Sequence, residues 1–531
     1  MRTYVRLGLL LAIALALTVV AGRGTPAYAW SYPAALNTNA ATDSGGDRQP
    51  QVTTDGAGHW LAVWQSNENV GGTIGTDDDI LVARSIDDGA TWTAPAALNT
   101  NAATDSGDDW YPQVTTDGAG NWVAVWASRD DLGGTIGTDL DILVARSTDN
   151  GGTWTAPVAL NTNAATDSRE DGPSQVTTDG AGNWVAVWRS DIVRPLGARS
   201  EGDIMVARST DDGATWTAPE FLNTDAASDV ESDTDPQVAT DGAGHWVAVW
   251  TSAYDSELFP PHYPSDSDIL VARSTDNGTT WTAPELVNTN SPMEVELHGS
   301  PQVATDGAGH WVAVWHFGHF YPPDTWEETD ILVARSTNNG ATWTAPAALN
   351  TNAATDSGDD WEPQVTTDGA GKWVAVWDSL ENLGGAIGTD TDILVAQSTD
   401  NGVTWTAPAA LNTNAATEAG RDASPQVATD GAGNWVAVWD SWDDLSGTIG
   451  TDFDILYATE FQAPPPPTPT PPAGVGGIVE LQVDGSDSLA SPADGPDAAG
   501  LPYAAIAAGA AAALVALGAG GWYARRRFSR G

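Results

Sequence analysis

The chain has 531 residues, of which 71 are Asp or Glu and 20 are Lys or Arg, so its formal net charge is −51. Nucleic-acid binding needs a basic surface that displaces counterions from phosphates, and this composition excludes it. The sequence has no cysteine, which excludes disulfides, thiolate metal sites and cysteine nucleophiles. A hydrophobic content of 41%, with 56 Gly and 26 Trp, predicts a folded protein of many short strands and turns.

Residues 1–29 have the features of a secretory signal peptide. Arg2 and Arg6 form a charged start, and Leu7–Ala21 is an apolar stretch too short to span a membrane comfortably. Ala27-Tyr28-Ala29 then provides a cleavage site of small residues. We therefore expect an exported protein whose mature chain begins at Trp30.

Residues 30–461 form an internal repeat with a step of 62 residues, except for one step of 65. Strands of the W-V-A-V-W type begin at Trp60, Trp122, Trp184, Trp246, Trp311, Trp373 and Trp435. Strands of the D-I-L-V-A type begin at Asp79, Asp141, Asp203, Asp268, Asp330, Asp392 and Asp454. In the second repeat the four predicted strands are Gln113–Thr116, Trp122–Trp126, Ile142–Ser147 and Trp154–Leu160. The glycine turn Asp117-Gly118-Ala119-Gly120 joins the first two as a hairpin.

A turn of the form S-x-D-x-G-x-T-W recurs six times, first as Ser85-Asp87-Gly89-Thr91-Trp92. The residues at its acidic position are Asp87, Asp149, Asp211, Asp276, Asn338 and Asp400. This turn resembles the Asp-box, or BNR repeat, of the sialidase superfamily. The resemblance covers about 430 residues and implies a β-propeller in which each box joins the third and fourth strands of a blade. Because a box carboxylate can accept backbone N–H bonds within its turn, we interpret these residues as structural.

The fold class predicted is therefore all-β, a seven-bladed propeller with four-stranded blades. Six boxes supply only six fourth strands, and the seventh repeat stops after Ile455–Thr459. The missing strand is at the other end, because Trp30–Leu36 copies Trp92–Leu98. We expect the N-terminal strand to pair with Ile455–Thr459 and close the ring, which removes the last open edge.

Acidic residues gather in the loops that this topology places opposite the boxes. They form D-x-D pairs, and four of these pairs are the candidate metal ligands: Asp77 and Asp79, Asp139 and Asp141, Asp390 and Asp392, and Asp452 and Asp454. Clustered carboxylates with glycines suit Ca²⁺, which takes six to eight hard oxygen ligands. The alternative interpretation is a solvated acidic surface without a cation.

The departures from the repeat are candidate positions for an organic ligand, since arginines beside aromatics and histidines suit a sugar or a carboxylate. They lie in the loops that follow the second strands of the third, fourth and fifth repeats. The residues are Arg189, Arg194, Arg199, Tyr263, His316, His319, Tyr321 and Trp326. The alternative is loop divergence without function.

Function is predicted in two forms. The resemblance implies that a catalytic sialidase would hold its substrate carboxylate with three arginines, the first in a Phe/Tyr-Arg-Ile-Pro motif, beside a Tyr–Glu pair. The sequence lacks that motif, and Val193-Arg194-Pro195 is only a fragment of it. We therefore expect a binding or structural module for an extracellular glycan or protein, with no catalytic residue assigned. The alternative is an exo-acting glycoside hydrolase of the sialidase type.

The C-terminal part has the features of a stalk and an anchor. Residues 462–500 begin with a polyproline stretch and continue as a small, acidic segment, which predicts an extended spacer. Residues 501–524 are long and apolar enough for a transmembrane helix, and the tail 525–531 carries three arginines. Positive charge stays on the cytoplasmic side, so the head is expected outside a cell membrane crossed once. Leu501-Pro502-Tyr503-Ala504-Ala505 resembles a sortase signal but lacks its Thr-Gly pair, so sortase anchoring is the alternative.

Overall fold

The computed structural model describes residues 29–193, 200–226, 231–253, 266–288, 295–321, 325–326 and 328–460. The chain divides into two units, Met1–Pro465 and Pro466–Gly531, and all described residues belong to the first. The predicted signal peptide up to residue 28, the stalk, the transmembrane helix and the tail lie outside the described residues. Among the described residues, no helix is long and apolar enough to cross a membrane.

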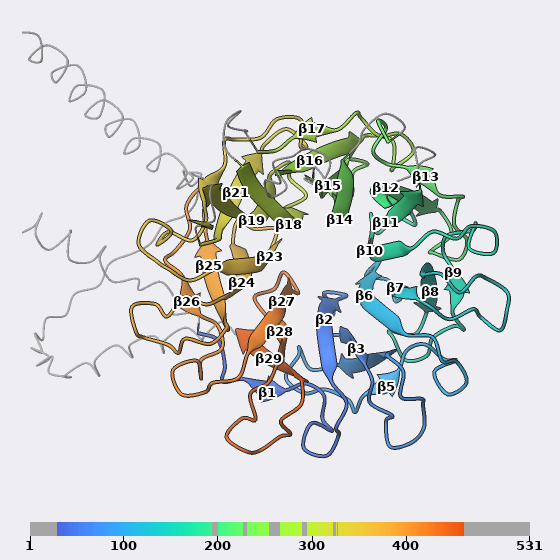
Figure 1. Ribbon diagram of the computed structural model, residues 1–531, viewed down its shortest axis with the longest axis horizontal. Coiled ribbons are helices and arrows are strands. Elements are labelled where there is room, and N and C mark those ends of the chain that lie inside the picture. Colours follow the sequence, from blue (N-terminus) through green and yellow to red (C-terminus); the bar gives the residue numbers. More distant parts are fainter. Residues whose placement is uncertain are drawn as a thin grey trace, which may run out of the picture. The chain divides into compact units, whose positions relative to one another are not determined.

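The described residues form seven antiparallel sheets arranged in a ring, as predicted (Figure 1). The first, innermost strands are β2 (Asp47–Thr54), β6 (Asp109–Thr116), β10 (Asp171–Thr178), β14 (Ser232–Thr240), β18 (Val295–Thr305), β23 (Asp360–Thr367) and β27 (Asp422–Thr429). The second strands are β3 (Trp60–Ser66), β7 (Trp122–Ser128), β11 (Trp184–Val193), β15 (Trp246–Ala253), β19 (Trp311–Tyr321), β24 (Trp373–Ser379) and β28 (Trp435–Ser441). The third strands are β4 (Asp79–Ser85), β8 (Asp141–Ser147), β12 (Ser200–Ser209), β16 (Ser267–Ser274), β21 (Asp330–Ser336), β25 (Asp392–Ser398) and β29 (Asp454–Glu460). The fourth strands are β5 (Ala96–Ala97), β9 (Val158–Ala159), β13 (Glu220–Phe221), β17 (Glu285–Leu286), β22 (Ala347–Ala348), β26 (Ala409–Ala410) and β1 (Ala34–Ala35). A further strand, β20 (Thr325–Trp326), pairs with β19. We number the blades 1 to 7 by their first strands, from β2 to β27.

The ring is closed by the N-terminal strand, as the copied sequence predicts. Ala34 lies opposite Tyr457 and Ala35 opposite Leu456, so β1 is the fourth strand of blade 7. Trp30 forms a bridge with Glu460, and the backbone N–H of Leu36 donates to the carbonyl of Ile455 at 2.7 Å. The last blade therefore has no open outer edge on β29.

The second strands form the core because both of their faces are covered by neighbouring blades. Trp122 and Trp126 of β7 pack against Leu61 and Val63 of the preceding blade, and all four side chains are fully buried. The same alternation recurs around the ring, and the two tryptophans of each second strand are almost or completely buried. The W-V-A-V-W pattern is apolar at successive positions because the strand has no solvent-facing side.

The fourth strands are shorter than predicted. The sequence pattern predicted Trp154–Leu160, but only Val158–Ala159 pairs with β8. Pro157 has no backbone N–H to donate and restricts Ala156 before it, so regular pairing begins only after it. The part of the segment before Pro157 still bonds to the third strand, since the backbone N–H of Thr155 donates to the carbonyl of Arg146 in β8 at 2.8 Å.

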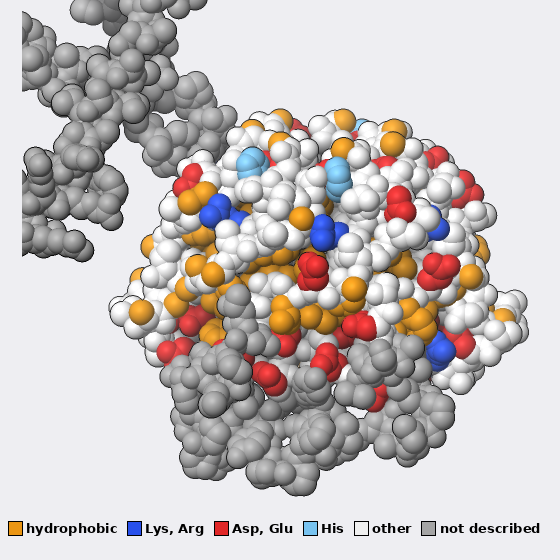
Figure 2. All heavy atoms as spheres, turned by 90° about the horizontal axis from the view of Figure 1, so that it is seen from above, with side chains coloured by type: hydrophobic (Ala, Val, Ile, Leu, Met, Phe, Trp, Pro, Cys, Tyr) orange, Lys and Arg blue, Asp and Glu red, His pale blue; other side chains and the backbone are white. Residues whose placement is uncertain are grey.

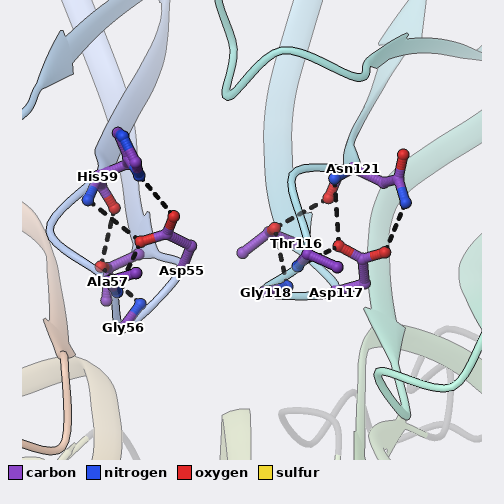
Figure 3. Close-up of polar contacts among 10 residues, drawn as sticks. Asp55, Gly56, Ala57, His59, Thr116, Asp117, Gly118 and Asn121 are labelled. Carbon is purple, nitrogen blue, oxygen red and sulfur yellow. Dashed lines mark hydrogen bonds and ion pairs between the residues drawn. The ribbon is translucent and has the colours of Figure 1, made fainter.

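Two tight turns, the box and the hairpin between the first and second strands, occupy the same face of blades 1 to 6, and blade 7 has only the hairpin. In the box of blade 1, Asp87 accepts bonds from the backbone N–H of Thr91 at 2.9 Å and from its hydroxyl at 2.7 Å. The hairpin between β2 and β3 has a similar device: Asp55 Oδ1 accepts the N–H groups of Ala57 and His59, as Figure 3 shows beside the matching Asp117 hairpin. Gly56 and Gly58 have φ of 68° and 101°, which explains the glycines of that turn. Carboxylates on this face are therefore used within their own turns.

Candidate functional site

The inner strands surround a cavity of about 170 Å³ at the centre of the ring. Each first strand contributes three consecutive residues to it, of the form x-Pro-Gln in every blade except blade 3, where Ser174 replaces the proline. The residues at the x position, which we call the rim residues, are Gln49, Tyr111, Pro173, Asp235, Ser300, Glu362 and Ser424. Since no two adjacent blades present the same side chain here, the rim breaks the sevenfold repetition.

A bulge in each first strand sets the direction of the rim residue. The pairing between β6 and β7 shifts between Trp110 and Gln113, and the other six blades shift at the equivalent point. Six rim residues have positive φ, from 47° at Glu362 to 56° at Tyr111, and the seventh is Pro173. Non-glycine residues adopt this conformation rarely, and bulges are a common way to re-aim a side chain next to a site. This feature was not predicted from the sequence, although a Pro-Gln pair follows the variable rim residue in six blades.

A second set of variable side chains lies one residue after the second tryptophan of each blade. We call these the post-Trp residues: Gln65, Ala127, Arg189, Thr251, His316, Asp378 and Asp440. Two of them accept a hydrogen bond from the rim residue of the next blade, which ties the two sets together. Asp440 Oδ2 accepts the N–H of Gln49 at 3.1 Å, and Gln65 Oε1 accepts the N–H of Tyr111 at 3.1 Å.

Carboxyl groups with raised pKa gather in blades 6 and 7. Burial raises the pKa of Asp440 to about 6. Burial also holds the pKa of Asp378 well above its usual range, and the neighbouring Glu362 raises it further. The pKa of Glu362 is itself raised, because protein atoms displace water from its carboxyl group, although Ser424 and Arg421 oppose the shift. Protonatable carboxyl groups therefore lie close together here near Arg421, and of these three only Glu362 lines the cavity.

Two of the predicted ligand residues have described side chains, and both lie at post-Trp positions rather than in loops. Arg189 forms an ion pair with Asp191 at 2.7 Å, and its charge acts on the rim residue Asp235. His316 is enclosed, and burial lowers its pKa to about 4, so it is neutral at physiological pH. The loop expectation was wrong for Arg189, His316, His319 and Tyr321, because β11 and β19 extend to Val193 and Tyr321. It was also wrong for Trp326, which lies in β20. Arg194, Arg199 and Tyr263 lie outside the described residues, as do the side chains of His319, Tyr321 and Trp326.

The predicted D-x-D residues lie in a second kind of site, a pocket between adjacent blades. Asp77 and Asp79 approach Asp105, which belongs to the loop that leads into the next blade, and one oxygen of each lies within 4.8 Å of the others. We call such groups the interblade pockets. Five are present among the described residues: Asp43 with Asp452 and Asp454; Asp77 with Asp79 and Asp105; Asp139 with Asp141 and Asp167; Asp330 with Asp356 and Asp360; and Asp390 with Asp392 and Glu418. Four pockets contain a predicted pair, and their third member was missed because nothing in the pattern shows which loop residue reaches the pair. The pocket of Asp330, Asp356 and Asp360 has no D-x-D pair and was missed entirely.

A buried asparagine anchors each of the described pairs. Asn99 Nδ2 donates to Asp79 Oδ1 at 2.7 Å and to Asp109 Oδ2 at 2.9 Å, and its oxygen accepts the N–H of Ile80. Burial raises the pKa of Asp79 to about 7, and Asp105 and Asp77 add to the shift. The arrangement can bind a hard cation through oxygen atoms alone.

Comparison with known proteins agrees with this architecture. Residues 200–428 match the model of the BNR repeat-like domain. No curated protein is significantly similar to the chain.

Several solved structures are similar to the chain at low identity. A protein of unknown function from Dyadobacter fermentans is 12% identical over 83% of this chain and all of its own, with a TM-score of 0.46. The Hadza microbial sialidase Hz136 is 19% identical over 62% of this chain and 63% of its own, with a TM-score of 0.38. The α-L-arabinanase of Penicillium chrysogenum is 13% identical over 66% of this chain and 92% of its own, with a TM-score of 0.42. At these identities the similarities say nothing about function.

Proposed function

Because the head is a seven-bladed Asp-box propeller that matches the BNR repeat-like domain over residues 200–428, we propose that it is a glycan-binding module. Its ligand occupies the central mouth. In this proposal residues 501–524 anchor the chain in a cell membrane, with the head outside.

The observation that carries the proposal is the ring of unlike rim residues around the central cavity. A binding site needs a concave surface with a few polar groups in fixed positions, and the bulges hold the rim residues in place. The carboxyl group of the rim residue Glu362 can accept hydrogen bonds from sugar hydroxyls. Tyr111, which is 38% exposed, offers a ring face against which a sugar can stack. The overall negative charge favours neutral or amino sugars over anionic ones.

The test is a glycan-array measurement on the purified full-length chain with matched variants. Tyr111→Ala and Glu362→Gln should each weaken binding of the selected glycans at least tenfold. Tyr32→Ala removes a tyrosine that is 59% exposed and belongs to the N-terminal segment outside the mouth, so it should leave binding unchanged. If the mouth variants bind the same glycans as strongly as the wild type, the ligand does not occupy the mouth.

A second function, an exo-acting glycosidase, is favoured by one observation. Glycoside hydrolysis uses two carboxyl groups, one of which is protonated in the resting enzyme. The raised pKa values of Asp378 and Asp440 beside Glu362 fit that requirement. The arginine partners of a sialidase are harder to assign, since Arg421 lies with these carboxyls and Arg189 is paired in blade 3.

The two functions are separated by assaying the same proteins for release of sugar from fluorogenic glycosides, including a sialoside. Binding without turnover supports the binding module. Turnover that disappears in Asp440→Asn and Glu362→Gln supports the hydrolase instead. The Tyr32→Ala chain serves as the control, because any loss of turnover in it would indicate a general defect.

A further inference from the structure

The interblade pockets contain buried oxygen atoms that no protein group satisfies. Asp79 is fully buried; its Oδ1 accepts the bond from Asn99, while its Oδ2 has no partner. Oδ2 of Asp77 and Oδ1 of Asp105 are also buried without a partner in the same pocket. A buried, unpaired carboxylate oxygen is costly, because desolvation removes its water without replacing it.

The same unpaired atoms recur in other pockets. Fully or almost fully buried aspartates with a partnerless Oδ2 are Asp79, Asp141 and Asp454. The partnerless oxygens of the third members belong to Asp43, Asp105, Asp167 and Asp356. In the fifth pocket a hydrogen bond joins the carboxyl groups of Asp392 and Glu418. Because the pockets are copies within an internal repeat, one pocket chemistry recurs around the ring.

The side chains that surround the pocket of blades 1 and 2 bring the carboxyls together instead of separating them. Asn101 Nδ2 donates to Asp105 at 2.6 Å and to Asp130 at 2.6 Å, which holds the loop acid over the pair. The oxygen of that amide is also buried without a partner. Among the described residues, no Lys or Arg forms an ion pair with Asp77, Asp79 or Asp105.

We propose that each of the five interblade pockets binds one Ca²⁺. All the available ligands are oxygens, which excludes the softer metals that prefer nitrogen or sulfur. Calcium–oxygen distances of about 2.3–2.6 Å allow two ligands of one ion to be up to about 5 Å apart, which matches the grouping within 4.8 Å. The smaller octahedral Mg²⁺ needs a tighter cage and keeps several of its waters.

Because each pocket lies between adjacent blades, a bound ion would connect the two blades. Asp77 and Asp79 lie at the start of β4 in blade 1, and Asp105 lies in the connection from β5 to β6 in blade 2. One ion therefore links two blades at the face opposite the boxes, where the carboxyls would otherwise repel one another. The calcium proposal does not depend on the ligand of the central mouth.

The test is calorimetric titration of the purified, chelator-treated full-length chain with CaCl₂ and, separately, MgCl₂ at constant ionic strength. The wild type should bind about five Ca²⁺ with at least tenfold preference over Mg²⁺. Asp77→Asn with Asp105→Asn should reduce the stoichiometry by one, and Asp139→Asn with Asp167→Asn, in a different pocket, should do the same. The double variant Asp88→Asn with Asp212→Asn is the control, because it removes equal charge at box positions where other boxes carry Asn150 and Asn277.

Loss of one calcium in each pocket variant, with the control unchanged, supports the proposal. Equal response to both ions, disappearing in high salt, would mean that cations only screen an acidic surface and would overturn it. Unchanged stoichiometry in both pocket variants would overturn it as well. A pocket variant that fails to fold is replaced by the other one, since the two pockets are independent.

Discussion

The residue after the second tryptophan differs in charge between blades, and in two blades it accepts a hydrogen bond from the rim residue of the next blade. Blade 3 places Arg189 there, blade 5 His316, and blades 6 and 7 place Asp378 and Asp440.

Asp440 provides a test of this position through pH. Its pKa rises from an ordinary 3.8 to about 6 in the folded protein. The protonated carboxyl therefore stabilises the folded state fully below pH 4, and this stabilisation is lost as the pH rises through 6 and the buried group ionises. Asp440→Asn cannot ionise but can still accept the bond from Gln49. We expect the variant to be more stable than the wild type by about 2–3 kcal/mol at pH 8, at about 1.4 kcal/mol per pKa unit, and equal to it at pH 4.

Urea unfolding of both chains at each pH, with calcium and salt held constant, measures the difference. Asp88→Asn, which removes a charge from a surface turn, should give the same small change at both pH values. A wild type and an Asp440→Asn chain with identical pH dependence would show that the carboxyl of Asp440 is not destabilised by burial.

At the scale of elements, the fifth box shows that asparagine can replace the box aspartate without loss of the hydrogen bonds of the turn. In the fifth box Asn338 Oδ1 accepts the N–H of Thr342 at 2.9 Å, and its Nδ2 donates to the threonine hydroxyl. Asn thus reproduces the two bonds that Asp87 makes with Thr91. Those bonds also lower the pKa of Asp87, the threonine hydroxyl contributing most.

Replacement of the five box aspartates tests the structural role. Changing Asp87, Asp149, Asp211, Asp276 and Asp400 to alanine should cost about 1 kcal/mol for each box, from the loss of hydrogen bonds in well-separated turns. The same five changed to asparagine should cost almost nothing. The midpoints of urea unfolding distinguish the two sets, and equal midpoints would mean that the box side chains are not needed for stability.

Sequence patterns predicted those elements whose cause is local or periodic. The boxes and the glycine hairpins have fixed residues at fixed positions, and the tryptophan strands repeat at constant spacing. The first-strand bulge was missed, because positive φ at Tyr111 or Glu362 has no compositional signature in residues that usually avoid it. The extension of β11 and β19 was missed as well, because polar residues such as Arg189 and His316 resemble a loop until their partner strand is known.

At the scale of the whole head, the ring is closed by contacts between the two ends of the repeat region. Asn37 Nδ2 donates to Asp454 Oδ1 at 2.7 Å, a contact between residues separated by 417 positions. Leu36, completely buried, belongs to the same core cluster as Trp60 and Val436. The closing strand is thus built like the fourth strands of the other blades, although its blade is assembled from both ends of the chain.

The stability contribution of the closing strand can be compared with that of an ordinary fourth strand, because Leu36 and Leu98 occupy equivalent positions in the two. Leu36→Ala and Leu98→Ala each remove a fully buried side chain, one from the closing strand and one from blade 1. Each should destabilise the chain by about 2–5 kcal/mol. The exposed Tyr32→Ala should have little effect. Thermal unfolding provides the measurement, and a Leu36→Ala chain as stable as wild type, beside a destabilised Leu98→Ala chain, would mean that the ring is not closed this way in solution.

This closure also makes the order of synthesis matter. Residues 30–37 are among the first of the head to leave the ribosome, but their partners in β29 are made last. Until Asp454–Glu460 have emerged, the apolar strand around Leu36 has nothing to pair with, while the middle blades can already stack. A chain truncated before β29 therefore keeps an unpaired, apolar strand at the start of the head.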